Sequence, residues 1–171
     1  ARVNFNESNP PLPSGRFADG FGRRWTATSN TNVRLSLHTG YPELSDGYTE
    51  SHRKNIRRSL KSGLSLTNDF SHADLVRMMR QMMDKKSVRL SGGIYHTLEA
   101  ILEAASRHLT ITKMGITGGD HHELVAAAFF LFSKKGVTYF SAATPAGKAS
   151  KAMFFLIDAF IREHAGSDEF I

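Results

Sequence analysis

Cysteine is absent from this chain of 171 residues. Its absence excludes disulfide bonds, metal sites built from thiolates and catalysis by a cysteine nucleophile. Long hydrophobic runs are absent too, because no stretch approaches the roughly 20 apolar residues that a membrane-spanning helix needs. Hydrophobic residues make up 40% of the chain and charged residues 22%, values typical of a globular protein with a real core. We therefore expect a cytoplasmic protein with no membrane span.

Negative charge is in short supply. Lys and Arg number 22 against 16 Asp and Glu, which gives a formal net charge of +6. A basic excess of this size favours an anionic partner, such as a phosphate-bearing cofactor, a nucleotide-linked substrate or RNA. The same excess fits a protein that is merely basic, so charge alone leaves both interpretations open.

Regular periodicity is lacking at the start of the chain. Residues 1–32 hold few apolar residues at any constant spacing and include a Pro-rich and Gly-rich stretch at 9–15. We interpret residues 1–32 as an irregular linker or part of a preceding segment, and 33–171 as one domain. A new strand begins at Phe170-Ile171, so we expect a longer protein whose further strands follow Ile171.

The hydrophobic pattern of 33–171 predicts an α/β (α+β) domain with a mixed, mainly antiparallel sheet. Strands are expected at 33–37, 64–66, 110–117, 123–133 and 137–144. Helices are expected at 49–62, 71–85 and 93–108, and from the loop at 144–147 to about residue 165. Ser71 and Asp74 resemble a capping box, and Asp158 and Arg162 are expected to form an exposed pair one turn apart.

The most informative segment is 137–152, where a strand, a loop of small residues and a helix follow directly. The first turn of a helix leaves backbone N–H groups unpaired, and small residues let a phosphate approach them. Lysines beside the loop add positive charge. The pattern predicts an anion pocket at 146–151, which includes Gly147, Lys148, Ala149, Ser150 and Lys151.

Two known phosphate motifs do not fit this segment. A Walker loop ending at Gly147-Lys148 requires Ser or Thr where Ala149 stands and Gly where Ala142 stands. A Rossmann fingerprint requires more glycines than the single one present. An ordinary strand-to-helix turn remains an alternative interpretation.

Small side chains also end the strand before the loop. Ser141, Ala142 and Ala143 follow the bulky Phe140, and side chains of this size leave room for a ligand along the strand backbone. Phe140 to Ala143 are therefore candidate cofactor-binding residues. We expect Gly147→Val to block donor binding while leaving the fold largely intact.

From about Ser51 to Ile171 the chain resembles the GNAT-like second domain of Fem-type aminoacyl transferases, the peptidoglycan-bridge type. The matching stretches are 51–63, 127–132 and 147–166, about two-thirds of the chain. The order of basic helix, paired helices, hairpin, glycine loop and helix carries the match. Gly147 and Ala149 fit the GNAT signature, whereas Thr144 stands where that family has Gln or Arg.

The resemblance implies an N-acyltransferase that moves an acyl or aminoacyl group from acyl-CoA (acetyl-CoA, for example) or aminoacyl-tRNA to an amine. The acceptor would be an amine such as one on a nucleotide-linked peptidoglycan precursor. Phe140 to Ala143 would hold the donor carbonyl, with backbone donors near Ala142 or Ala143 for the oxyanion, and Gly147 to Lys151 would hold its phosphates. No catalytic side chain is assigned. The departure at Thr144 weakens the case for coenzyme A, and both donors stay open.

A basic helix supplies the remaining candidates. Arg53, Arg57 and Arg58 lie in the helix predicted at 49–62 and would bind the phosphates of a nucleotide-linked substrate or tRNA, unless they simply form a solvated face. The alternative function is a non-catalytic GNAT-like module that binds a nucleotide-linked glycan or RNA. Adjacent His121 and His122 point in different directions, so we expect no metal.

Overall fold

The computed structural model describes residues 15–18, 24–27, 35–85, 92–133, 136–168 and 171. The chain divides into two compact units, residues 1–34 and residues 35–171. In the first unit, β1 (Gly15–Ala18) and β2 (Arg24–Ala27) pair as an antiparallel hairpin. The sequence pattern did not predict these two strands.

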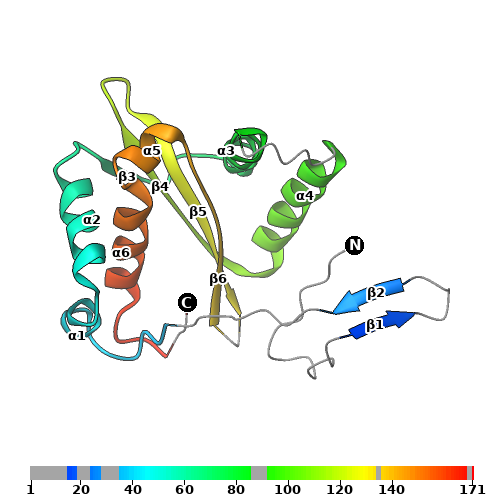
Figure 1. Ribbon diagram of the computed structural model, residues 1–171, viewed down its shortest axis with the longest axis horizontal. Coiled ribbons are helices and arrows are strands. Elements are labelled where there is room, and N and C mark those ends of the chain that lie inside the picture. Colours follow the sequence, from blue (N-terminus) through cyan, green and yellow to red (C-terminus); the bar gives the residue numbers. More distant parts are fainter. Residues whose placement is uncertain (1–14, 19–23, 28–34, 86–91, 134–135, 169–170) are drawn as a thin grey trace. The chain divides into compact units, whose positions relative to one another are not determined.

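A four-stranded sheet organises the second unit (Figure 1). Its order is β3-β4-β5-β6, formed by Ser65–Thr67, Thr110–Gly118, Glu123–Ser133 and Gly136–Ala143. The predicted α/β class with an antiparallel sheet is therefore confirmed. Every pair among these described strands is antiparallel, so the parallel pairing implied by a mixed sheet is not found in them.

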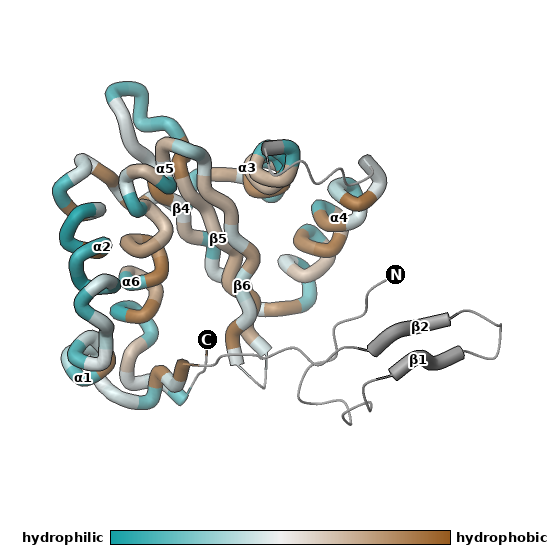
Figure 2. Tube along the Cα trace, in the orientation of Figure 1, coloured by the Kyte–Doolittle hydropathy of each residue, from teal (hydrophilic) through white to brown (hydrophobic). Residues whose placement is uncertain are grey.

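Helices flank both faces of the sheet. Figure 1 shows α2 (Glu50–Leu60) and α6 (Ala152–His164) on one side, and α3 (His72–Lys85) and α4 (Gly92–His108) on the other. The brown, hydrophobic stretches in Figure 2 run along β5, α6 and α4. Their apolar residues build two core clusters, one against each face of the sheet.

β5 supplies side chains to both clusters because its successive residues point to opposite faces. Phe130 lies against α6 and stacks on Phe160, with ring centroids 3.7 Å apart. Phe129 lies on the opposite face, where its ring meets those of Phe70 and His72. The strand predicted at 123–133 is confirmed, and its nearly continuous apolar run is typical of a strand that is buried on both faces.

Local capping explains where two helices begin. The Thr49 hydroxyl accepts the His52 N–H at the start of α2. At α3 the Ser71 hydroxyl accepts the Asp74 N–H, and the Asp74 carboxylate accepts the Ser71 N–H at 2.8 Å. The predicted capping box is thus confirmed. These bonds from Ser71 to the carboxylate hold the pKa of Asp74 below its ordinary value.

Three local features differ from those predicted. No helix or strand was predicted between residues 37 and 49, where the structure has a short helix, α1 (Tyr41–Asp46). The loop expected at 144–147 instead opens another short helix, α5 (Pro145–Ala149), so the last predicted helix is two helices. In the strand predicted at 33–37, Leu35 exchanges two backbone hydrogen bonds with Ile171, while residues 33–34 lie outside the described ranges.

Candidate functional site

The outer edge of β6 is the first component of the candidate site. Among the described strands, β6 has β5 as its single neighbour and leaves its other edge unpaired. The Thr144 N–H donates to the Val125 carbonyl at 2.9 Å. These two residues continue the pairing of β6 with β5 one residue beyond the pair Ala143–Ala126. In an antiparallel ladder, hydrogen-bonded pairs alternate with non-bonded pairs. The backbone N–H and C=O groups of even-numbered residues in β6 therefore point toward β5, and those of odd-numbered residues point toward the unpaired edge.

This alternation separates the two residues predicted to supply an oxyanion donor. The Ala142 amide faces β5, whereas the backbone N–H groups of Ser141 and Ala143 face the open edge. Ser141 is half-exposed, whereas Ala143 is buried, with 9% of its surface exposed. Within the predicted donor-binding stretch 140–143, the outward amides are therefore those of Ser141 and Ala143.

The small side chains at the end of β6 also have a packing role. Ala142 belongs to the core cluster shared with α3 and α4, and Ala143 to the cluster shared with α6. Phe140 is half-buried and packs against the core cluster that contains Ala142. Helices therefore pack against both faces of the sheet at Ala142 and Ala143, so a ligand would approach this part of β6 from its unpaired edge.

Thr144 shapes the turn from β6 into α5. Its hydroxyl accepts the Gly147 N–H at 3.1 Å, its carbonyl accepts the Lys148 N–H at 2.9 Å, and Pro145 follows it as the first helical residue. The Ser150 N–H donates to the Ala146 carbonyl and the Lys151 N–H to the Lys148 carbonyl. Most amides of the predicted pocket at 146–151 already have acceptors within the chain.

Gly147 is required by close packing against β5. A Cβ atom placed there would lie 2.1 Å from the Val125 carbonyl oxygen, far inside van der Waals contact. Val125 sits at a β-bulge, where the β4–β5 register shifts by one residue. The expectation that Gly147→Val leaves the fold largely intact is therefore wrong, because the valine side chain would displace the strand backbone.

The junction between α5 and α6 supplies the second component of the site. Lys151 adopts a left-handed conformation (φ 63°, ψ 29°), and α6 starts at the next residue. The amides of Ala152 and Met153 have no intrahelical acceptor, as in the first turn of any helix. Lys148 is exposed and Lys151 half-exposed, and neither ammonium group has an ion-pair partner among the described residues.

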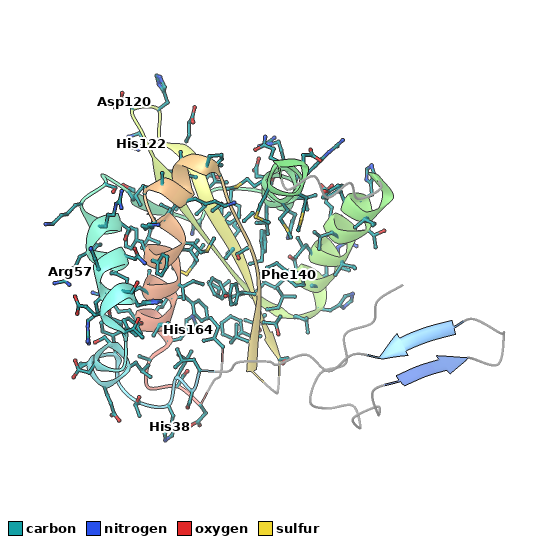
Figure 3. All side chains as sticks on the ribbon, viewed as in Figure 1. His38, Arg57, Asp120, His122, Phe140 and His164 are labelled. Atoms are coloured by element: carbon teal, nitrogen blue, oxygen red, sulfur yellow. The ribbon has the colours of Figure 1, made fainter. Side chains whose placement is uncertain are left out.

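Two arginines of the basic helix α2 contact the carboxylate of Glu50, in the first turn of the same helix. Arg57 contacts the Glu50 carboxylate at 2.8 Å, and Arg53 lies 3.7 Å from the same carboxylate. Arg53 also donates to the Asp46 carbonyl. Arg58 is exposed, and Figure 3 shows Arg57 pointing away from α6 and the sheet. Exposed pairs of this kind contribute little to stability, so these side chains can exchange partners.

Sequence reasoning missed a polar cluster behind α6. Asp158 is only 3% exposed, which corrects the expected exposed pair with Arg162. The Tyr41 hydroxyl donates to Asp158 at 2.8 Å, and Arg162 donates to Tyr41 at 3.0 Å. Burial and then the hydrogen bond to Asp158 raise the pKa of Tyr41, and burial raises that of Tyr48. The hydrogen bonds of this cluster connect α1 to α6, and none of them involves a predicted site residue.

The predicted site residues thus gather at one place, except for the arginines of α2. Phe140 to Ala143 and Gly147 to Lys151 follow one another along the edge of β6 and through α5. No protein-family model matches this chain, and no curated protein matches it. No helix in the described ranges is both long and apolar enough to cross a membrane.

The tip between β4 and β5 carries the histidine pair considered above. Figure 3 shows Asp120 and His122 at this tip, away from the helices. His122 has a φ of 50°, and both histidines are exposed. The part of the chain that the structure describes contains no group of three or more His, Asp or Glu residues able to hold a metal ion.

Proposed function

We propose that this chain is an N-acyltransferase of the GNAT type, related to the Fem-type branch, and that it binds its acyl carrier along the outer edge of β6. The observation that carries the proposal is the direct succession of an unpaired strand edge and a lysine-flanked helix start. Ser141 and Ala143 offer outward amides, and Lys148 and Lys151 lie just beyond them in the chain.

The order of elements supports the resemblance to the GNAT fold. After α2 comes a strand, a pair of helices, three antiparallel strands, the short helix α5 and the helix α6. The resemblance in sequence was based on the same order of basic helix, paired helices, hairpin and final helix. It rests on the arrangement as a whole, because Thr144 departs from the family signature.

The donor would lie with its carbonyl at the outward amides and its phosphates near the two lysines. In the reaction, the acceptor nitrogen attacks the carbonyl carbon and an amide bond forms. The C–S bond of a thioester, or the C–O bond of an aminoacyl ester, breaks. The proton lost by the amine goes to the leaving thiolate or alkoxide. Backbone N–H groups aimed at the developing oxyanion would stabilise the transition state.

The geometry also changes which amides would meet the phosphates. Thr144 already accepts the Gly147 amide and Ala152 is fully buried, so the available donor is the Met153 amide at the start of α6. Gly147 would then shape the turn, while Lys148 and Lys151 would supply the charge. The donor phosphates would bind about one helical turn further along the chain than the glycine motif alone indicates.

Turnover assays test the proposal. We expect the protein to transfer an acyl group from acyl-CoA or aminoacyl-tRNA to an amine such as a lysine side chain. The double variant Lys148→Gln, Lys151→Gln should bind the donor about tenfold or more weakly and retain the wild-type melting temperature. Lys54→Gln, an exposed lysine of α2, is the matched control.

The alternative function predicts a different result. A non-catalytic module that holds a nucleotide-linked glycan or RNA through α2 would bind without turnover. Its affinity would fall with Arg57→Ala or Arg58→Ala and would not change with the two lysine substitutions. That outcome would replace the acyltransferase proposal.

A further inference from the structure

A hollow of about 290 Å³ lies between α3 and α4, on the side of the sheet opposite α6. Its size is near the lower limit of small-molecule sites. It shares no residue with the β6 edge or with the α5–α6 junction. Three of the residues that line it on each helix matter for the argument: Val76, Arg77 and Arg80 of α3, and Tyr95, His96 and Glu99 of α4.

Tyr95 contributes a polar group that the chain does not satisfy. The residue is 8% exposed, and its hydroxyl is shielded from solvent. This hydroxyl has no hydrogen-bond partner among the described residues. Buried hydroxyl groups are nearly always hydrogen-bonded, because an unpaired one forfeits its bonds to water. The Tyr95 hydroxyl is therefore an unused bonding group, and a ligand in the hollow reaches it only when the Tyr95 side chain shifts toward the hollow.

Opposite charges stand on the two walls of the hollow. The Arg80 guanidinium carbon lies 5.8 Å from the centroid of the Tyr95 ring, and Glu99 follows Tyr95 by one turn of α4. Among the described residues, neither Arg80 nor Glu99 has an ion-pair partner. Arg77 differs, because it is paired with Asp74. A free cation on α3 and a free carboxylate on α4 thus border one site.

We infer that this hollow binds a small zwitterion, such as an amino acid, across the face of Tyr95. The ligand carboxylate meets the Arg80 guanidinium, and its ammonium group meets Glu99. A shift of the Tyr95 side chain toward the hollow lets its hydroxyl donate to the same carboxylate. Val76 provides an apolar wall for a short aliphatic side chain. The inference does not rest on the proposed acyltransferase function, because it concerns a different site and is tested by binding alone.

An NMR titration of the full chain tests the ligand class. L-alanine is the zwitterionic probe, acetate carries only the carboxylate, and ethylamine carries only the ammonium group. We expect L-alanine to shift the backbone amides of 73–80 and 92–99 in a saturable manner, with an affinity about tenfold or more above that of either single-charge probe. Equal responses to acetate and L-alanine, or no saturable response, would overturn the inference.

Matched variants test the two walls. Glu99→Gln and Arg80→Gln should each weaken L-alanine binding about tenfold. Glu103→Gln, one turn further along α4 and outside the hollow, should have no effect on binding. Tyr95→Phe should also weaken binding while its melting temperature stays at or above that of the wild type. Unchanged affinity in Glu99→Gln, or a lower melting temperature in Tyr95→Phe, would contradict the assignment.

Discussion

The two faces of the sheet satisfy their polar groups in different ways. On the α6 face, the buried Asp158 is bonded to Tyr41, a residue 117 positions away in the sequence. On the α3–α4 face, polar groups pair locally in the Ser71–Asp74 capping box and over long range between His72 and Ser106, while the Tyr95 hydroxyl has no partner among the described residues. The α6 face thus holds a buried carboxylate that the chain itself bonds, whereas the α3–α4 face borders a hollow flanked by Arg80 and Glu99, neither of them ion-paired within the described part of the chain.

The most disruptive change should be one that breaks the close packing on the α6 side. Gly147→Val places a side chain against the Val125 carbonyl, 2.1 Å from the position of its Cβ atom. We expect the free energy of unfolding to fall by about 3 kcal/mol or more, measured by urea denaturation.

Gly93→Ala is the matched change on the other face. A Cβ atom at Gly93 would meet no heavy atom within 4 Å, and the residue lies in α4. Alanine there should raise the free energy of unfolding by up to about 1 kcal/mol. Similar stabilities for Gly147→Val and Gly93→Ala would refute the difference in packing.

Removing the buried carboxylate on the α6 side should have the next largest effect. Asp158→Ala leaves the Tyr41 hydroxyl and the Arg162 guanidinium without their acceptor, so we expect a loss of about 2–3 kcal/mol in thermal or chemical denaturation. Asp120→Ala, at the exposed tip between β4 and β5, should change stability by less than about 0.5 kcal/mol. Equal effects of the two would show that Asp158 is not held as described.

Two tyrosine hydroxyl deletions sharpen the comparison directly. Tyr41→Phe removes a hydrogen bond to Asp158 and should cost about 1 kcal/mol of stability. Tyr95→Phe removes a hydroxyl that has no described partner, so its stability should be unchanged or slightly higher. Both changes in the free energy of unfolding are measured in the same denaturation experiment. A larger loss of stability in Tyr95→Phe than in Tyr41→Phe would contradict the described difference between the two faces.

The smallest effect should depend on pH. Asp74 has a lowered pKa in the folded protein because Ser71 bonds to its ionised form, so its stabilising effect is present above the unfolded carboxyl pKa of about 3.9. It is lost as the pH falls through the lower folded pKa. Asp74→Ala should cost about 1 kcal/mol at neutral pH, and this cost should vanish in strong acid. Asn68→Ala, which changes an exposed and non-titratable side chain nearby, should show no such pH dependence.

The difference between near and distant contacts explains what the sequence could predict. The capping box, the apolar run of β5 and the helical periodicity all depend on neighbours within a few residues, and their elements were predicted within a residue or two. Asp158 was misplaced because its partner Tyr41 lies in a separate helix, which no local pattern connects to α6. The split between α5 and α6 depends on one left-handed residue, Lys151, which has no glycine to signal it.

The candidate site could be predicted in part for the same reason. The succession of small residues, glycine and lysines located the end of β6 and the start of the following helices. The sequence could not show that Gly147 packs on the Val125 carbonyl, since that contact crosses between strands. Nor could it distinguish the Ala142 amide from that of Ala143, because this requires the register with β5.

Amide hydrogen exchange along β6 tests the central claim most directly. In the free protein, the amides of Ser141 and Ala143 should exchange faster than those of Phe140 and Ala142, because only the latter pair bonds to β5. Saturating acyl-CoA or aminoacyl-tRNA should slow the exchange of Ser141 and Ala143 and leave the other two unchanged. Exchange at Ser141 and Ala143 that is unaffected by either donor would contradict a carrier bound along this edge.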